Sequence, residues 1–253
     1  MSRTFDALRK AEAAKDKVVE SPLSTFSVDG HKAPKIQWDT NGSAVEYESV
    51  AVWLTNPVNR GQRLQTVMVV SSHSGTGSTT TAALLAETLA KVKKRRVLII
   101  DSNFRTPSLN MVFQVKNNGG FTEVVSDSLP LDAHIQPTTR ENLFVLTSGR
   151  IANFPAEVFE SELIDQLIAQ LKEKFDFIIF DAAPVGEFPD AFALAPKVDS
   201  IIMVAQSEKT SIEDAQRAKL NLERAGGRIL GVVLNRQVDY TPSFLRRFFG
   251  PAN

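Results

Sequence analysis

Residues 66–89 read TVMVVSSHSGTGSTTTAALLAETL, and this stretch decides the fold. It opens with an apolar run, Val67 to Val70, that is typical of a short buried strand, and continues into a turn rich in serine and glycine. The segment after the turn has helical spacing, with apolar residues on one face at Ala82, Leu85, Ala86 and Leu89. A strand, a glycine turn and a helix in this order form a phosphate-binding loop, in which backbone N–H groups and the helix N-terminus face an anion.

The turn carries several residues of a nucleotide-binding loop but lacks its main cation. Gly75 and Gly77 lie within it, and Thr79 stands where the hydroxyl ligand of Mg²⁺ is expected. The pattern also requires a lysine just before that hydroxyl, to reach the β- and γ-phosphates, and here the residue is Ser78. The sequence therefore predicts the shape of a nucleoside triphosphate site without its main cation.

Length and composition set broad limits on the protein. The chain has 253 residues, enough for one large α/β domain or two small ones. Lys+Arg and Asp+Glu both number 29, so no net charge points to nucleic acid as a partner, and the absence of cysteine excludes disulfides. No apolar run approaches about 18–20 residues, and the first residues are too charged for a signal peptide. We therefore expect a cytoplasmic protein that does not bind nucleic acid.

Polar residues follow three further apolar strands at the point where each strand ends. Asp101 follows residues 97–100, Asp181 follows residues 177–180, and Asn235 follows residues 229–234. Amphipathic helices alternate with these strands, which predicts an α/β fold with a doubly wound, mainly parallel sheet, as in P-loop NTPases. Ligands bind such sheets at the carboxyl ends of the strands. The predicted nucleotide-binding residues are Gly75, Thr76, Gly77, Ser78, Thr79, Thr80 and Asn235.

Two carboxylates beside a hydroxyl-bearing phosphate loop are what Mg²⁺-assisted phosphoryl transfer requires. We assign Asp101 and Asp181 as candidate catalytic residues, and both of them together with Thr79 as candidate metal ligands. Asp181 would hold the metal or position water, and Asp101 would face the γ-phosphate. The alternative is that both aspartates only cap the ends of strands.

The domain boundaries follow from composition. Residues 1–17 are predicted to form an N-terminal helix, either solvated or docking on a partner, and residues 18–42 to form a flexible linker. The loop-containing domain covers residues 43–240, and within it residues 210–213 form a capping box that opens a helix ending at Gly226 and Gly227. Residues 241–253 form a tail whose phenylalanines and arginines suit a membrane surface, a partner groove or packing on the domain.

Three motifs carry a resemblance to a known family. They are HSGTGSTTTAALLA (73–86), LIIDSNFRTPSLN (98–110) and DFIIFDAAPVGEFPDA (176–191). These motifs occur in the same order in the bacterial tyrosine kinases, the autokinases of exopolysaccharide and capsule assembly. The chain resembles this family from Ser43 to about Val238. That family belongs to the deviant Walker group, with MinD and ParA. The resemblance implies ATP and Mg²⁺ as cofactors and a membrane polysaccharide co-polymerase as the partner.

The chain departs from the family pattern at the phosphate-binding residues. The loop lysine is replaced by Ser78, the additional lysine of MinD-type ATPases by His73, and the second acid of the family's Asp-x-Asp motif by Asn103. Loss of the loop cation removes electrostatic stabilisation of the transferring phosphate, worth several kcal/mol in comparable sites.

It also departs where the family oligomerises and is phosphorylated. The oligomerisation motif Glu-x-x-Arg-x-x-Arg reads Glu46-x-x-Ser49-x-x-Val52, and the C-terminal tyrosine cluster is reduced to Tyr240. A homo-oligomer would therefore be weakened. These residues are lost while the fold-defining residues are kept, which indicates a degraded enzyme whose folded scaffold is still used.

Three functions fit these features. The first is a kinase-like regulator or scaffold of exopolysaccharide synthesis and export, peripheral at the inner face of the plasma membrane, in which catalysis is impaired and the cofactor site is weak or unused. The second is an active Mg-ATP-dependent tyrosine autokinase or ATPase, in which His73 or a partner's lysine supplies the cation. The third is a positioning ATPase of the MinD or ParA type, against which the kinase-like motifs and the missing additional lysine argue.

Overall fold

The computed structural model describes residues 27–28, 31–32, 44–55, 64–91, 93–127, 129–150, 159 and 162–236. The chain divides into two units, Met1–Lys35 and Ile36–Asn253. In the first, β1 (Ser27–Val28) pairs antiparallel with β2 (His31–Lys32), within the predicted linker. The predicted N-terminal helix (1–17) and tail (241–253) lie outside the described residues.

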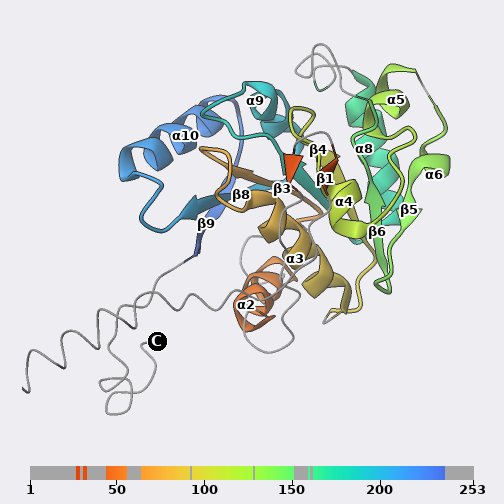
Figure 1. The fold of residues 1–253 in the computed structure, drawn as a ribbon, viewed down its shortest axis with the longest axis horizontal. Helices are drawn as coiled ribbons and strands as arrows, with labels where there is room; N and C mark the ends of the chain where they lie inside the picture. The colour runs from red at the N-terminus through yellow and green to blue at the C-terminus, as the bar shows by residue number, and fades with distance from the viewer. Residues whose placement is uncertain are drawn as a thin grey trace, which may run out of the picture. The chain divides into compact units, whose positions relative to one another are not determined.

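The second unit is built on a sheet of seven strands (Figure 1). Its order is β5-β6-β4-β7-β3-β8-β9, and β5 alone of these runs antiparallel to its neighbour. The strands are β3 (Thr66–Ser71), β4 (Val97–Ser102), β5 (Gln136–Pro137), β6 (Leu143–Leu146), β7 (Phe177–Ala182), β8 (Ser200–Gln206) and β9 (Ile229–Asn235). The strand that leads into the glycine turn, β3, therefore lies inside the sheet between β7 and β8.

Helices cover both faces of this sheet. They are α2 (Ala44–Thr55), α3 (Ser78–Lys91), α4 (Leu109–Phe113), α5 (Phe121–Ser126), α6 (Leu131–His134), α8 (Glu162–Lys174), α9 (Asp190–Leu194), the 3₁₀ turn η2 (Ala195–Lys197) and α10 (Ile212–Arg224). The side chains of a strand alternate between faces, so β3 contributes Val67 and Val69 to one core and Met68 and Val70 to the other.

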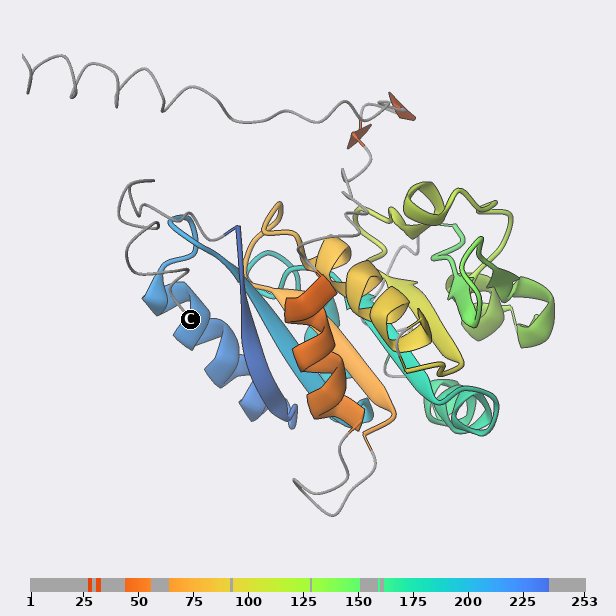
Figure 2. The same cartoon turned by 90° about the horizontal axis from the view of Figure 1, so that it is seen from below.

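Each core recruits its own helices. The core on the Val67 face takes in α2, α3 and α4, and Figure 2 shows α2 and α3 together on this side of the sheet. The core on the Met68 face takes in α5, α8, α9 and α10. Each buried Leu, Ile or Phe side chain contributes about 1.5–3 kcal/mol relative to exposure. The predicted doubly wound, mainly parallel α/β fold is confirmed.

The N-cap of the helix that follows β8 lies one residue later than the capping box predicted at 210–213. Ser211 is the N-cap of α10, and its hydroxyl accepts a hydrogen bond from the Asp214 N–H at 3.0 Å. The Thr210 hydroxyl instead accepts a bond from the Gln206 N–H at 2.9 Å. The prediction was wrong because both residues can cap a helix, and the turn after β8 engages the first of them.

The helix that carries the altered oligomerisation motif packs through its small and apolar residues. Ala51 and Leu54 of α2 are buried in the core shared with α3. Ser49 is exposed, and Val52 is an exposed hydrophobic residue with 47% of its surface accessible. The two positions at which the family carries arginine therefore lie on the outer surface of α2.

Candidate functional site

The glycine turn has the backbone geometry of a phosphate-binding loop. Gly75 and Gly77 have positive φ angles of 77° and 93°, which glycine adopts without strain. Helix α3 begins at Ser78, and the Thr81 N–H bonds to the Gly77 carbonyl at 2.9 Å. The N–H groups of the first turn of α3 have no partner within the helix, so this end of α3 attracts an anion.

Asn235 fixes the shape of this loop. Its Nδ2 donates to the Thr76 carbonyl at 2.8 Å, and its Oδ1 accepts from the Arg236 N–H at 2.9 Å. A Cβ on Gly77 would collide with this amide group. Asn235, a predicted ligand, thus positions the loop in this structure through one Nδ2 hydrogen and through Oδ1.

The two predicted carboxylates lie side by side at the end of the sheet. Asp101 of β4 and Asp181 of β7 are register partners, and both are buried. Asp101 Oδ2 accepts the N–H groups of Ser108 and Leu109, each at 2.9 Å, at the start of α4. Burial raises the pKa of Asp101 to about 6, against the lowering effect of these backbone bonds.

Asp181 has no such partners. Neither of its carboxylate oxygens makes a hydrogen bond within the described part of the chain. Burial raises its pKa well above the usual range, the neighbouring Asp101 raises it further, and the nearby Thr79 hydroxyl, outside hydrogen-bond geometry, opposes the rise. A buried carboxylate without donors is costly unless a cation or a proton neutralises it.

The residues at this position fit a magnesium ion. The Asp181 oxygens and the Thr79 hydroxyl are the hard oxygen ligands that Mg²⁺ prefers, and they face each other across β7 and α3. Among the described residues, no group of three or more His, Asp or Glu side chains could hold a metal. An ion at this site would therefore need water or phosphate oxygens to complete its coordination.

Asn103, at the family's second acid, has a structural role. Its Oδ1 accepts the Thr106 N–H at 3.2 Å, and its Nδ2 donates to the Thr106 hydroxyl at 3.1 Å. The next residue, Phe104, is fully buried and stacks on Phe121 and Phe159 with ring centroids 5.8 and 5.3 Å apart. These contacts fix the turn that brings the α4 amides to Asp101.

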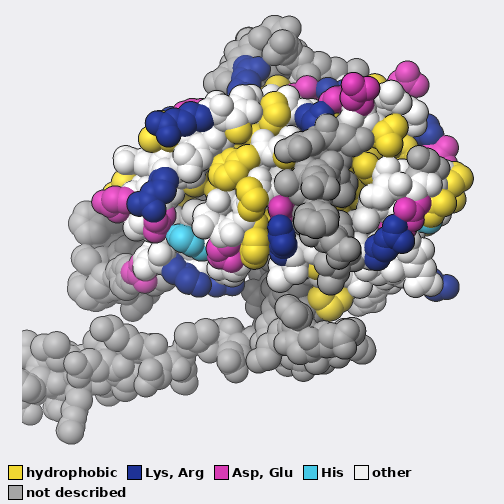
Figure 3. Space-filling view, turned by 90° about the horizontal axis from the view of Figure 1, so that it is seen from above, with side chains coloured by type: hydrophobic (Ala, Val, Ile, Leu, Met, Phe, Trp, Pro, Cys, Tyr) yellow, Lys and Arg dark blue, Asp and Glu magenta, His cyan; other side chains and the backbone are white. Residues whose placement is uncertain are grey.

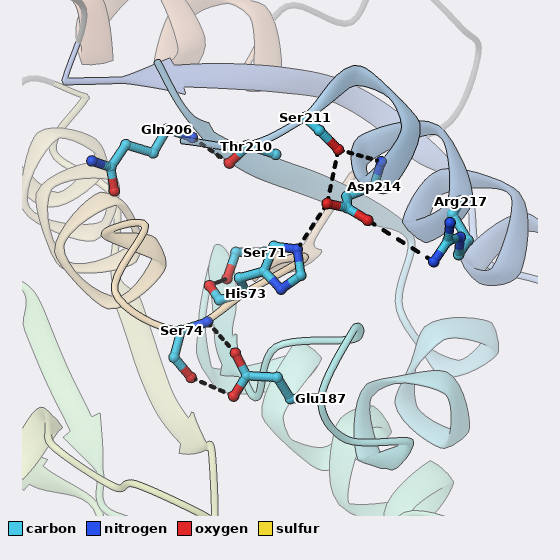
Figure 4. Close-up of polar contacts among 9 residues, drawn as sticks. All are labelled: Ser71, His73, Ser74, Glu187, Gln206, Thr210, Ser211, Asp214 and Arg217. Carbon is cyan, nitrogen blue, oxygen red and sulfur yellow. Dashed lines mark hydrogen bonds and ion pairs between the residues drawn. The ribbon is translucent and has the colours of Figure 1, made fainter. Parts of the chain in front are cut away.

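Acidic side chains flank the outer side of the loop (Figure 4). Glu187, after β7, accepts hydrogen bonds from the Ser74 N–H at 2.6 Å and the Ser74 hydroxyl at 2.7 Å. The Ser74 N–H is the first cause that holds the pKa of Glu187 below its usual range. His73 Nε2 lies 3.2 Å from Asp214 Oδ2 on α10. Neither acid was predicted from the sequence.

A second ion pair joins the loops after β4 and β7. Arg105 Nε and a terminal guanidinium nitrogen donate to the two oxygens of buried Asp190 at 2.8 and 3.0 Å. The Arg105 guanidinium also lies 4.9 Å from the centre of the Phe188 ring. Arg105 and Asp190 both belong to quoted family motifs, but their pairing was missed because only the fold brings them together.

The surface around the sheet is mixed in character. The face drawn in Figure 3 intersperses basic, acidic and hydrophobic side chains over the described part of the molecule. No helix in the described ranges is long and apolar enough to cross a bilayer.

Comparison with known proteins agrees with this fold. Residues 64–230 match the family model described as an AAA domain. The chain is 33% identical over 183 residues to the tyrosine-protein kinase CpsD of Streptococcus pneumoniae, covering 72% of this chain and 80% of CpsD. The solved chimerical protein CapA2B2 superimposes with a TM-score of 0.72 at 28% identity, covering 77% of this chain and 85% of that one.

MinD from Pyrococcus horikoshii, solved with Mg-ADP, gives a TM-score of 0.59 at 27% identity, with 72% of this chain and 76% of MinD covered. A parallel sheet with a glycine loop between a central strand and a helix defines a P-loop NTPase-like protein. Within that class, the chain belongs to the bacterial tyrosine-protein kinase family.

Proposed function

We propose that this protein is a kinase-like regulator or scaffold of exopolysaccharide synthesis and export, peripheral at the inner face of the plasma membrane, which acts by binding a membrane polysaccharide co-polymerase. Membership of the tyrosine-protein kinase family supports the pathway, because the chain resembles the members of that family that act in exopolysaccharide and capsule assembly. The observation that carries the proposal is Ser78, which begins α3 in place of the loop lysine.

The site would bind a nucleoside polyphosphate with Mg²⁺ but transfer phosphate poorly. Backbone N–H groups of the loop and α3 would hold the phosphates, and Thr79 and Asp181 would hold the ion. When bound, Mg²⁺ would neutralise charge on the phosphate oxygens. In an active site of this type, a positive charge stabilises the transferring phosphate group in the transition state, and Ser78 cannot supply that charge.

Asp101 adds to this argument. Its Oδ2 accepts two backbone N–H groups at the start of α4, so one of the two candidate catalytic carboxylates already has a structural function. Asn103 likewise bonds within its own turn. The chain thus keeps the scaffold of the kinase site, and Asp101 and Asn103 have hydrogen-bonding functions within their own turn.

A second function, an active Mg-ATP-dependent autokinase or ATPase, is favoured by one observation. Both Asp181 oxygens are buried without a hydrogen-bond partner in the described ranges, an arrangement that costs stability unless a cation is bound. If the site no longer bound a cation, the protein would be more stable without this carboxylate, so its presence favours a functional metal site.

Complementation of a deletion strain separates the two functions. If binding is what matters, Thr79→Ala should restore secreted polysaccharide almost fully, whereas deletion of residues 1–17 or 243–253, the amphipathic ends of the sequence, should restore little. Protein levels would be checked by immunoblot. Failure of Thr79→Ala at normal abundance, with success of both deletions, would favour the active enzyme.

A further inference from the structure

A lysine from another part of the fold lies at the phosphate loop. The Lys209 ammonium nitrogen is 3.7 Å from the position that a Cβ would take on Gly75. Lys209 is exposed, and no carboxylate pairs with its ammonium group within the described part of the chain. An unpaired cation beside the open side of an anion-binding loop is placed to meet an anionic ligand.

The turn that carries Lys209 is well defined. The N–H groups of Lys209 and Thr210 bond to the Gln206 carbonyl at 3.2 and 2.9 Å, and the Gln206 N–H bonds to the Thr210 hydroxyl at 2.9 Å (Figure 4). Glu208 has a positive φ of 63°, which a non-glycine residue adopts only in tight turns. The Cα of Lys209 is therefore held in place, while its side chain can move.

The turn and the loop are attached to the same residue. The Asn235 carbonyl accepts the Ser207 N–H at 2.9 Å, and the Asn235 side chain donates to the Thr76 carbonyl at 2.8 Å. Asn235 thus fixes the distance between the base of Lys209 and the loop. The cation comes from the end of β8, a strand adjacent to the one that leads into the loop.

Other charges near the loop are already engaged. Glu187 is bonded to Ser74, and His73 lies against Asp214, which also bonds to Ser211 and lies 4.0 Å from Arg217 (Figure 4). A polyphosphate that approached Gly75 would compete with Glu187 for the Ser74 N–H, and Lys209 would offset the repulsion between the two anions. Arg236, the next residue after Asn235, donates to the Gln206 side-chain amide at 3.3 Å, whereas the Lys209 ammonium group lies beside Gly75 and is well placed for the ligand.

We propose that Lys209 supplies, from the same chain, the positive charge that Ser78 does not, and that it contacts the polyphosphate of a nucleoside di- or triphosphate bound at the loop. This rests on the proposed function only in taking the loop as a nucleotide site. Because Lys209 approaches from the solvent side, and not from within the loop as the missing lysine would, it would contribute to binding without restoring efficient phosphoryl transfer.

The test is a titration of the purified full chain with Mg-ADP and Mg-ATP by calorimetry. Lys209→Gln should weaken binding about tenfold to a hundredfold, the range expected for loss of a charged hydrogen bond. Lys209→Arg should retain most of the affinity. Lys219→Gln, which removes an exposed lysine paired with Glu223 on α10, is the matched control and should change affinity less than twofold.

A double-mutant cycle tests whether Lys209 replaces the loop cation. Ser78→Lys should tighten binding, and Lys209→Gln should then cost less than it does in the natural chain, because two cations share one function. Thermal unfolding would confirm that each variant folds. Unchanged affinity in Lys209→Gln, an equal loss in Lys219→Gln, or no binding by the natural chain at millimolar nucleotide would each overturn the assignment. The polysaccharide complementation above tests the function separately, so the two can fail independently.

Discussion

Asp101 and Asp181 are register partners on adjacent parallel strands, but only the Asp101 carboxylate accepts hydrogen bonds from the described part of the chain. Asp101 accepts three backbone N–H groups, those of Asn103, Ser108 and Leu109, whereas both Asp181 oxygens lack a partner among the described residues. Equivalent positions in the sheet therefore differ in hydrogen bonding, although burial raises the pKa of both carboxyl groups. The first two predictions follow from this difference.

Asp181→Asn should stabilise the protein at neutral pH in the absence of metal and nucleotide. The folded-state pKa of Asp181 lies well above the value of 3.8 expected when unfolded, so the natural folded state holds its proton more tightly. The contribution of the Asp181 carboxyl group to the free energy of unfolding is full below the unfolded-state pKa of 3.8 and is lost as pH rises through the folded-state pKa. Asparagine does not ionise, so Asp181→Asn avoids this loss of stability at neutral pH.

We expect Asp181→Asn to raise the free energy of unfolding at pH 7.5 by about 1 kcal/mol or more, because the amide is equally short of partners but carries no buried negative charge. The gain should shrink as pH falls toward 4. Chemical denaturation in chelator at several pH values measures it. A variant less stable than the natural chain at pH 7.5 would show that Asp181 has a partner in the apo protein.

Asp101→Ala should destabilise the protein at pH 4, where the raised pKa of Asp101, about 6, no longer costs stability. It leaves the N–H groups of Ser108 and Leu109 buried without their acceptor, which should cost about 1–2 kcal/mol. Asp101→Asn keeps an acceptor oxygen and should cost less, so it serves as the matched control. Equal losses in the two variants would argue against capping of α4 as the function of this residue.

The contrast between the two aspartates could not be predicted from the sequence. Both follow an apolar strand, and both were assigned the same chemistry. After Asp101 the chain turns, and the α4 amides reach its carboxylate; after Asp181 the N–H groups of Val185 and Gly186 bond instead to the carbonyls of Ser71 and Ser72, each at 2.9 Å. The difference depends on the path of the loops, which residue patterns do not specify.

Gly77→Ala should destabilise the loop. The positive φ of Gly77 strains any residue with a Cβ, by about 1–3 kcal/mol, and the added methyl group would collide with the Asn235 amide. Gly231→Ala is the control, because a Cβ there meets nothing within 4 Å.

Asn235→Ala alone should also destabilise the loop, because it removes the bond to the Thr76 carbonyl. The double variant Gly77→Ala/Asn235→Ala should lose less stability than the sum of the two single changes, because the collision is absent while the backbone strain remains. Thermal unfolding and nucleotide titration measure both effects. Similar behaviour of Gly77→Ala and Gly231→Ala would contradict the loop geometry.

The loop itself shows what sequence patterns predict well. A continuous apolar strand, two glycines and an apolar helix face were enough to predict β3, the turn and α3, because each depends on local conformation and burial. Lys209 was missed for the opposite reason. It lies in an ordinary polar turn, and only the parallel arrangement of β3, β8 and β9 brings it to Gly75.

Autophosphorylation should be negligible in the natural chain. Ser78 provides no positive charge for the transferring phosphate, and Tyr240, outside the described residues, is the one tyrosine of the C-terminal segment. Mass spectrometry after incubation with Mg-ATP measures it. Abundant phosphate on Tyr240 that disappears in Asp181→Ala would show that the site remains catalytic.

The most direct test of the central claim is the polysaccharide secreted by a strain whose only copy of this protein carries Asp181→Asn. That variant removes the carboxylate proposed to bind the metal and is expected to fold at least as well as the natural chain, so loss of protein should not confuse the result. If the protein acts by binding rather than by phosphoryl transfer, secretion should stay close to that of the natural copy, compared at equal abundance. Secretion near that of the deletion strain would contradict the account.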